Sequence, residues 1–228
     1  MASAVSAVLR SKLSGYARTC GSAQRGQPSI QCRPCFRTSA TLNMCGLAHV
    51  AWKQVLEPGD LAVDLTCGNG LDTLFLAEAV GPKGTVFAID IQQCAVDSTR
   101  ELLEQKLEDD CRPETHLHCT CHSRLLEVLG QTHVGSAKVI ALNLGYLPGA
   151  DKSLATTVSS TQQAVEAALQ AVCLGGMVSC MCYVSNDAEL QMVRSKFASL
   201  GQQWASTETR LTNKKNAPVL CLAWRLSL

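Results

Sequence analysis

The sequence predicts an α/β protein built on a doubly wound, seven-stranded, mostly parallel sheet that ends in an antiparallel hairpin. Short apolar runs alternate with helical patterns through most of the chain, which is typical of strands joined by crossover helices. A glycine-bracketed turn follows the first apolar run and leads directly into a helical pattern. Two final apolar runs are separated only by a short polar segment, which predicts the hairpin.

The elements follow from periodicity and from the residues that interrupt it. Helices are expected where apolar residues recur every three or four positions, at residues 44–55, 72–80, 92–107, 123–129, 158–173 and 187–200. Strands are expected at the short apolar runs 61–65, 85–90, 116–119, 138–142, 177–183, 203–209 and 219–225. Pro58-Gly59, Gly81-Pro82 and Gly175-Gly176 are interpreted as breaks between elements.

The first 43 residues differ in composition from the rest of the chain. They are rich in Ser, Ala, Arg and Gly, and no acidic residue precedes Glu57. This composition predicts an organellar transit peptide, for chloroplast or mitochondrion, ahead of a single domain at residues 44–228. A disordered basic arm that binds RNA is the competing interpretation.

Charge and cysteine content exclude some classes of protein. The first 44 residues hold six of the 20 basic residues and none of the 19 acidic ones, so the remainder carries a net charge of −5. A large basic surface for nucleic acid is therefore not expected. No apolar run approaches the roughly 18 residues of a membrane span, so no membrane partner is expected. The 13 cysteines lack paired metal-ligand spacings, so neither a metal site nor a disulfide framework is predicted.

Residues 61–72 predict a nucleoside-binding loop. The strand ends near Asp64, and the turn Gly68-Asn69-Gly70 lets the backbone approach a ligand, because glycine has no Cβ. Asp90 ends the second predicted strand, 20 residues beyond Gly70. An acid at this distance is placed to accept hydrogen bonds from the ribose hydroxyls of an adenosine.

The residues around this loop favour S-adenosylmethionine over NAD. The dinucleotide fingerprint expects a small residue where this chain has Thr73, and the carboxylate of Asp64 would repel a pyrophosphate. S-adenosylmethionine carries a sulfonium and an ammonium, and an acidic loop suits both. NAD is the alternative ligand for this loop. A tight turn that binds no ligand is the third interpretation.

A second group of candidate residues follows the fourth predicted strand. Asn143 offers one acceptor and two donors, which can hold an acceptor amine in line for attack. Tyr146 can stack on a base or wall the pocket, and Asp151 can accept a proton. The alternative interpretation of this segment is an ordinary loop containing glycine and proline, with Asn143 as a cap and no catalytic role. His122, after the third strand, fits either a ring beside adenine or a surface histidine.

Three segments together resemble one known family. Asp-x-Thr-x-Gly-Asn-Gly-x-Asp-Thr begins at Asp64, Ala-x-Asp-Ile-Gln begins at Ala88, and Asn-Leu-Gly-Tyr-Leu-Pro-Gly-x-Asp-Lys begins at Asn143. They are similar to the YtqB-type family of class I methyltransferases, over about residues 48–225. The family includes enzymes that methylate the aminomethyl nitrogen of a modified wobble uridine in tRNA. Two departures lie near the expected acceptor side: Leu71 stands where bacterial relatives carry His, and Tyr183 is not followed by Pro-Gly-His.

The resemblance implies a Rossmann-like fold, S-adenosyl-L-methionine as donor and tRNA as partner. It implies donor contacts at Asn69, Asp72, Asp90, Gln92 and His122. Together with Asp64, Thr66, Gly68 and Gly70 of the loop, these residues form the predicted donor site. Asn143 and Tyr146 would face the acceptor amine, and Asp151 or a water would take its proton. An rRNA or small-amine methyltransferase is the alternative enzyme, and a catalytically silent RNA-binding factor is the alternative of another class. The sequence does not determine the oligomeric state, and a homodimer is one of the alternatives.

Overall fold

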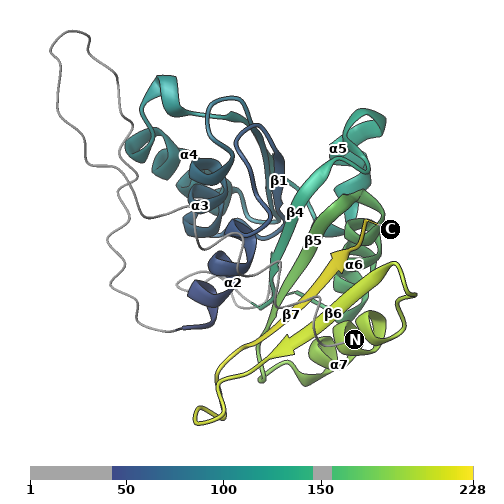
Figure 1. Cartoon of the computed structure of the whole chain (residues 1–228). Coiled ribbons are helices and arrows are strands. Elements are labelled where there is room, and N and C mark those ends of the chain that lie inside the picture. Colours follow the sequence, from purple (N-terminus) through teal and green to yellow (C-terminus); the bar gives the residue numbers. More distant parts are fainter. Residues whose placement is uncertain (1–42, 146–155, 228) are drawn as a thin grey trace, which may run out of the picture. The chain divides into compact units, whose positions relative to one another are not determined.

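Seven strands form one sheet in the order β3-β2-β1-β4-β5-β7-β6 (Figure 1). The computed structural model describes residues 43–145 and 156–227. Neighbouring strands from β3 to β5 run parallel, whereas β7 runs antiparallel to both β5 and β6. The strands are β1 (Leu61–Asp64), β2 (Thr85–Asp90), β3 (Glu114–Cys119), β4 (Ala137–Asn143), β5 (Val172–Cys182), β6 (Trp204–Thr209) and β7 (Val219–Arg225). The predicted mostly parallel sheet with a closing hairpin is confirmed.

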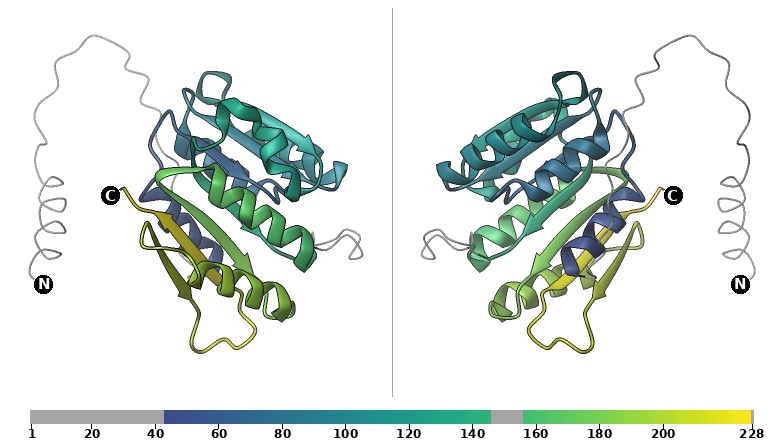
Figure 2. Two further views of the ribbon diagram at one scale, coloured as in Figure 1. Left: turned by 90° about the vertical axis from the view of Figure 1, so that its right-hand side faces the viewer. Right: turned by 90° about the vertical axis from the view of Figure 1, so that its left-hand side faces the viewer.

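Helices cover both faces of this sheet, and Figure 2 shows each face in turn. One face carries α2 (Met44–Lys53), α3 (Leu71–Val80) and α4 (Gln93–Lys106). The other carries α5 (Leu125–His133), α6 (Val158–Ala171) and α7 (Asp187–Ala198). Two short 3₁₀ helices, η1 (Asp109–Cys111) and η2 (His122–Arg124), flank β3. Within the described part of the chain, no helix has the length and apolar character to cross a membrane.

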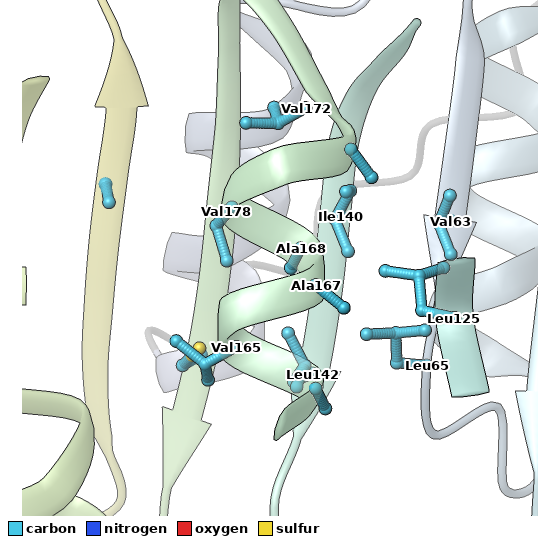
Figure 3. Close-up of a cluster of buried hydrophobic side chains, with 14 of the residues drawn as sticks. Val63, Leu65, Leu125, Ile140, Leu142, Val165, Ala167, Ala168, Val172 and Val178 are labelled. Carbon is cyan, nitrogen blue, oxygen red and sulfur yellow. The ribbon is translucent and has the colours of Figure 1, made fainter. Parts of the chain in front are cut away.

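Side-chain alternation along the strands creates two large hydrophobic cores, one on each face of the sheet. Val63 of β1 enters one core, as does Leu65 just after the strand, and Ala62 enters the other. In the first core the alanines of α6, including Ala167 and Ala168, let the helix lie close to β4 and β5 (Figure 3). Residues buried on both faces explain why the parallel strands appear in the sequence as continuous apolar runs.

Strand β5 begins five residues earlier than the sequence predicts, at Val172 instead of Met177. Its register against β4 shifts between Ala137 and Val139, so the glycine pair lies in an irregularity within the strand, not in a turn before it. A Cβ on Gly176 would lie 2.7 Å from the carbonyl oxygen of Lys138, so glycine is required there. A glycine pair marks a bulge and a turn equally well, and only the neighbouring strand distinguishes them.

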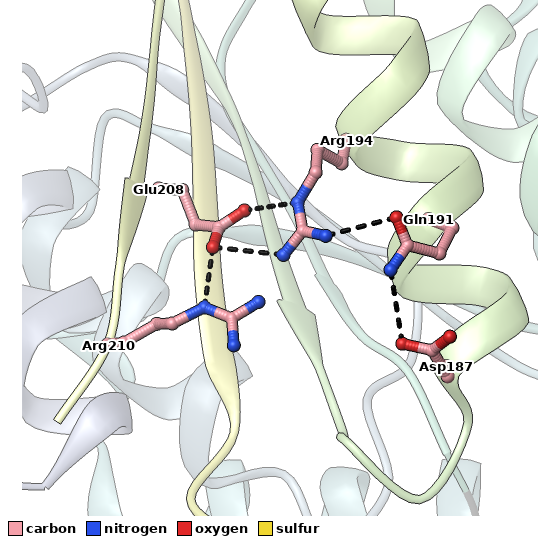
Figure 4. A network of polar contacts seen from close by, with 5 residues as sticks. All are labelled: Asp187, Gln191, Arg194, Glu208 and Arg210. Carbon is pink, nitrogen blue, oxygen red and sulfur yellow. Dashed lines mark hydrogen bonds and ion pairs between the residues drawn. The ribbon is translucent and has the colours of Figure 1, made fainter. Parts of the chain in front are cut away.

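Ion pairs orient α7 on the edge strand β6. Arg194 donates to the two carboxylate oxygens of Glu208 at 2.7 and 3.0 Å, and Arg210 donates to the same carboxylate at 2.5 Å (Figure 4). Gln191 links Arg194 to Asp187 along the helix. Because these side chains are partly exposed, each pair contributes at most about 1 kcal/mol. The packing of α7 depends mainly on Leu190, Val193 and Phe197, which enter the first core.

Candidate active site

A cavity of about 350 Å³ opens beyond the carboxyl ends of β1, β2 and β4. Its walls come from the segments after these strands, from α2, and from the start of α6. Eight predicted site residues line it: Thr66, Gly68, Asn69, Asp72, Asp90, Gln92, His122 and Asn143. Asp64 and Gly70 do not line it. Tyr146 and Asp151 lie outside the described residues.

The glycine turn is held from behind by α4. The Gly70 N–H donates to the carbonyl of Cys67 at 2.8 Å, and the Thr99 hydroxyl donates to the carbonyl of Gly68 at 3.3 Å. Gly70 has a positive φ of 80°, and a Cβ there would lie 2.9 Å from the Cα of Thr99. Gly70 therefore serves the close approach of α3 and α4, while Gly68 and Asn69 face the cavity.

Asp90 fixes the two loops that border the cavity. One carboxylate oxygen accepts from the N–H of Gly68 at 3.0 Å, and the other accepts from the N–H of Gln92 at 3.0 Å. An ionised carboxylate has about four lone-pair sites, so two hydrogen bonds leave acceptor capacity for a ligand. The carboxylate is thus held rigidly where ribose hydroxyls are expected, and that contact stays a prediction.

The sequence analysis expected Asp64 to face the ligand. In the structure it lies behind the loop and does not line the cavity. Its side chain is only 1% exposed. It accepts from the Thr73 hydroxyl at 2.6 Å and from the Thr66 N–H at 3.1 Å. Side chains alternate along a strand, and the last residue of β1 points toward α3 and away from the cavity. Asp64 therefore supports the shape of the turn.

Burial raises the pKa of Asp64 from 3.8 to about 7. Desolvation is the largest cause, and the negative charge of Asp72 adds to it. The hydrogen bonds from Thr73 and Thr66 act in the opposite direction. The folded protein consequently binds this proton more tightly than the unfolded chain does.

The raised pKa predicts a pH-dependent stability that an Asp64→Asn variant lacks. A proton held more tightly in the folded state stabilises it below about pH 4, and this contribution is lost as the pH rises through 7. When the pH rises from 5 to 8, the free energy of unfolding of the original protein should fall by roughly 2 kcal/mol more than that of the variant. Urea unfolding of both proteins at the two pH values measures this. An unchanged difference would show that Asp64 titrates normally.

The electrostatics of the cavity favour a cationic ligand. Its described lining contains the carboxylates of Asp72 and Asp90 but neither lysine nor arginine. The negative charges of Asp72 and Asp90 each raise the pKa of Asp64, which shows how close the three acids lie. Bound positive charge would relieve this repulsion, whereas a pyrophosphate would increase it. A sulfonium with an ammonium group fits such a lining.

His122 presents a buried hydrogen-bonding atom on the same cavity. The residue is 8% exposed, and its Nε2 atom has no hydrogen-bond partner among the described residues. Burial lowers the pKa of the ring, and the Ser160 backbone and Asp90 oppose this shift. A neutral imidazole with an unsatisfied nitrogen is costly unless a ligand or water completes it. Because His122 lines the cavity with Asp90 and Gln92, its position fits an adenine ring.

Asn143 ends β4 at the wall of the cavity. Its backbone N–H donates to the Thr66 hydroxyl at 2.7 Å, which ties the end of β4 to the loop after β1. Gly145, two residues further on, exchanges hydrogen bonds with Thr156 at 2.9 and 3.0 Å. Thr156 in turn donates to Glu189 at 2.9 Å, and Glu189 is 1% exposed.

The cavity also contains residues that the sequence analysis did not select. They are Cys45, His49, Leu65, Cys67, Leu71, Ile91, Cys121, Leu144, Gly145, Thr156, Ser160 and Tyr183. His49 lies on α2 and was not among the predicted site residues. Tyr183 follows β5 at the same edge of the sheet, a position that could have indicated a site residue. Cys45 and His49 could not be placed, because nothing in the sequence shows where α2 packs.

The strand order and the acid-lined cavity define a class I S-adenosylmethionine-dependent methyltransferase. The chain belongs to the family described as "Putative rRNA methylase", whose model matches residues 86–225. It is 35% identical over 188 residues to the chloroplastic tRNA (mnm(5)s(2)U34)-methyltransferase of Arabidopsis thaliana, covering 78% of this chain and 68% of that protein.

Solved structures agree with this assignment. A "putative rRNA-methylase" from Clostridium thermocellum is 30% identical, with a TM-score of 0.73 over 81% of this chain and 98% of its own. A "putative methyltransferase" from Streptococcus mutans, solved in complex with SAH, is 29% identical, with a TM-score of 0.69 over 80% of this chain and 97% of its own. The protein is therefore a methyltransferase that uses S-adenosylmethionine.

Proposed function

We propose that this enzyme methylates the exocyclic aminomethyl nitrogen of a modified wobble uridine in tRNA. The observation that carries the proposal is the position of Asn143, at the end of β4 on an acid-lined cavity. An amide there can orient an amine, and the carboxylates favour a cationic donor and a cationic acceptor. The similarity to a tRNA (mnm(5)s(2)U34)-methyltransferase supports the choice of substrate.

In this proposal each group of residues has a separate task. Asp90, His122 and the turn around Gly68 hold the nucleoside part of the donor, and Asn143 holds the acceptor amine. S-adenosylmethionine supplies an electrophilic methyl group. Methyl transfer needs nitrogen, carbon and sulfur in line, with the reacting atoms about 3 Å apart, so the main contribution of the protein is positioning.

The test is methylation of defined RNA by the purified full-length protein. Transfer RNA that carries 5-aminomethyl-2-thiouridine is incubated with labelled donor, and its nucleosides are analysed by mass spectrometry. A mass gain of one methyl group on that nucleoside supports the proposal. Ribosomal RNA and a free alkylamine are assayed in parallel, because the family description and the small cavity make these the alternative acceptors. Donor binding without methylation of any acceptor would indicate a silent RNA-binding protein.

We further propose that residues 1–43 direct the protein to an organelle. The acid-free, Ser- and Arg-containing composition supports this, as does similarity to a protein named as chloroplastic. A fluorescent reporter fused behind these residues should enter chloroplasts or mitochondria. A reporter that stays in the cytosol would favour a basic arm instead. Removal of the segment should leave donor binding unchanged, since the cavity is formed by later residues.

A further inference from the structure

His49 and Asp72 form a close polar pair on the wall of the cavity. The Nε2 atom of His49 lies 2.6 Å from Oδ1 of Asp72. The two side chains are 25% and 21% exposed, so both are largely shielded while the cavity still reaches them. They come from different elements, α2 and the first turn of α3. The pair therefore exists only because α2 packs beside α3 on one face of the sheet.

This pair lies at the Asn143 end of the site. A smaller void next to the main cavity is lined by Cys45, Asp72 and Asn143, together with core residues of β4 and β5. Cys45 is one helical turn from His49 on the same side of α2, and both line the main cavity. His49 is thus a neighbour of the residue proposed to orient the acceptor amine.

The surroundings of His49 fix the orientation of its ring. The imidazole stacks on Phe75, with 4.1 Å between ring centroids and an interplanar angle of 17°. The Trp52 ring lies 5.0 Å from the imidazole in a tilted orientation and also contacts Phe75, edge on, at 5.9 Å. An ionised Asp72 can only accept a hydrogen bond, so the ring donates through Nε2 and the neutral tautomer keeps its lone pair on Nδ1. In other enzymes the same arrangement, a carboxylate that orients a histidine, creates a general base.

We propose that His49 is the general base that deprotonates the acceptor, and that Asp72 fixes its tautomer. The proposal rests on the proposed function, because an alkylamine is mostly protonated at neutral pH and must lose a proton before it can attack. The ammonium transfers one proton to Nδ1 of His49, giving an amine and an imidazolium. The nitrogen–methyl bond then forms as the methyl–sulfur bond breaks, and the electron pair leaves with sulfur. The partly exposed imidazolium afterwards releases its proton to water.

The charged and titratable groups around His49 are compatible with this role. Asp72 faces it from α3, and the buried Asp64 is close enough for the charge of Asp72 to raise its pKa. Cys45 and Lys53 lie one turn away on α2 itself. Burial and the charge of Asp72 raise the pKa of the Cys45 thiol, so this group stays neutral. Asp72 is consequently the negative charge that stabilises the imidazolium.

The experiment measures single-turnover methylation of an amine-bearing tRNA between pH 6 and pH 10, with the full-length protein saturated with donor. In His49→Gln the amide can still donate to Asp72 but cannot take a proton. We expect its rate at pH 7 to fall about 100-fold or more, the usual contribution of a general base. The deficit should shrink by about tenfold per pH unit toward pH 10, because free amine then forms without the enzyme.

Two further measurements separate catalysis from folding. Calorimetric affinity for S-adenosylmethionine should stay within a few fold in His49→Gln, since Asp90, His122 and the turn around Gly68 hold the nucleoside part of the donor in the proposal, and the glutamine amide can still donate to Asp72. His133→Ala is the matched control: His133 also contacts a phenylalanine ring, Phe87 at 5.3 Å, but it does not line the cavity. Its rate and its pH profile should equal those of the original protein.

Three results would overturn the role of His49 alone: a normal rate in His49→Gln, a rate lowered by the same factor at every pH, or a parallel loss of donor affinity. In each case the original protein would still methylate the amine. If the original protein methylates no amine at any pH, the proposed function fails and the role of His49 fails with it.

Discussion

Replacing Asn143 with alanine is expected to lower the single-turnover methylation rate about 100-fold or more, while the affinity for S-adenosylmethionine stays within a few fold. The amide of Asn143 lies on the cavity wall at the end of β4, beside the His49–Asp72 pair. Its loss removes the group proposed to align the acceptor nitrogen. The backbone hydrogen bond from Asn143 to Thr66 survives the substitution, so the donor loop should keep its shape.

The measurement combines rapid-quench kinetics on amine-bearing tRNA with calorimetry for the donor. Asn213→Ala is the control, because Asn213 is an exposed residue between β6 and β7 and does not line the cavity. A normal rate in Asn143→Ala would remove Asn143 from the active site. A large loss of donor affinity would instead assign it to donor binding.

Replacing Asp90 with alanine is expected to weaken donor binding by about 2 kcal/mol or more, which is roughly 30-fold in affinity. The carboxylate accepts from the N–H groups of Gly68 and Gln92, so the variant loses a ligand acceptor and also the tie between two loops. Asp90→Asn should lose less, because the amide keeps one oxygen acceptor and nearly the same shape.

Calorimetric titration of the purified variants with S-adenosylmethionine tests this expectation. Asp97→Ala is a suitable control: Asp97 lies on α4, pairs with the exposed Arg100, and does not line the cavity. It should bind the donor as the original protein does. Equal affinity in Asp90→Ala would show that the ribose is held by another group.

Local patterns were sufficient to predict the sheet and most of the donor loop. The donor loop depends on features that are close together in the sequence: the apolar run at 61–65 and the turn Gly68-Asn69-Gly70. Asp90 follows them at the fixed spacing of a strand–helix–strand unit. Parallel strands align their carboxyl ends at one edge, so residues that end successive strands are brought together whatever the details of packing. Asp90, His122 and Asn143 accordingly line one cavity.

The direction of a side chain was harder to predict than its place along the chain. Asp64 was expected to face the ligand, but strand alternation turns it toward α3, where Thr73 binds it. The glycine pair 175–176 was interpreted as a turn, although it lies in an irregularity of β5 against β4. In both cases the deciding neighbour comes from a distant part of the sequence.

The sequence by itself determined the mostly parallel sheet, the glycine turn and the acidic character of the donor site, because each depends on short-range periodicity or on residue chemistry. Only the tertiary structure decided which carboxylate faces the cavity and which one is buried behind it. It also decided that α2 packs beside α3 on one face of the sheet, which brings His49 to 2.6 Å from Asp72. The two residues are 23 positions apart in the sequence and meet only through helix packing. Helix packing depends on the shape of whole helix faces, which cannot be predicted from a local sequence pattern.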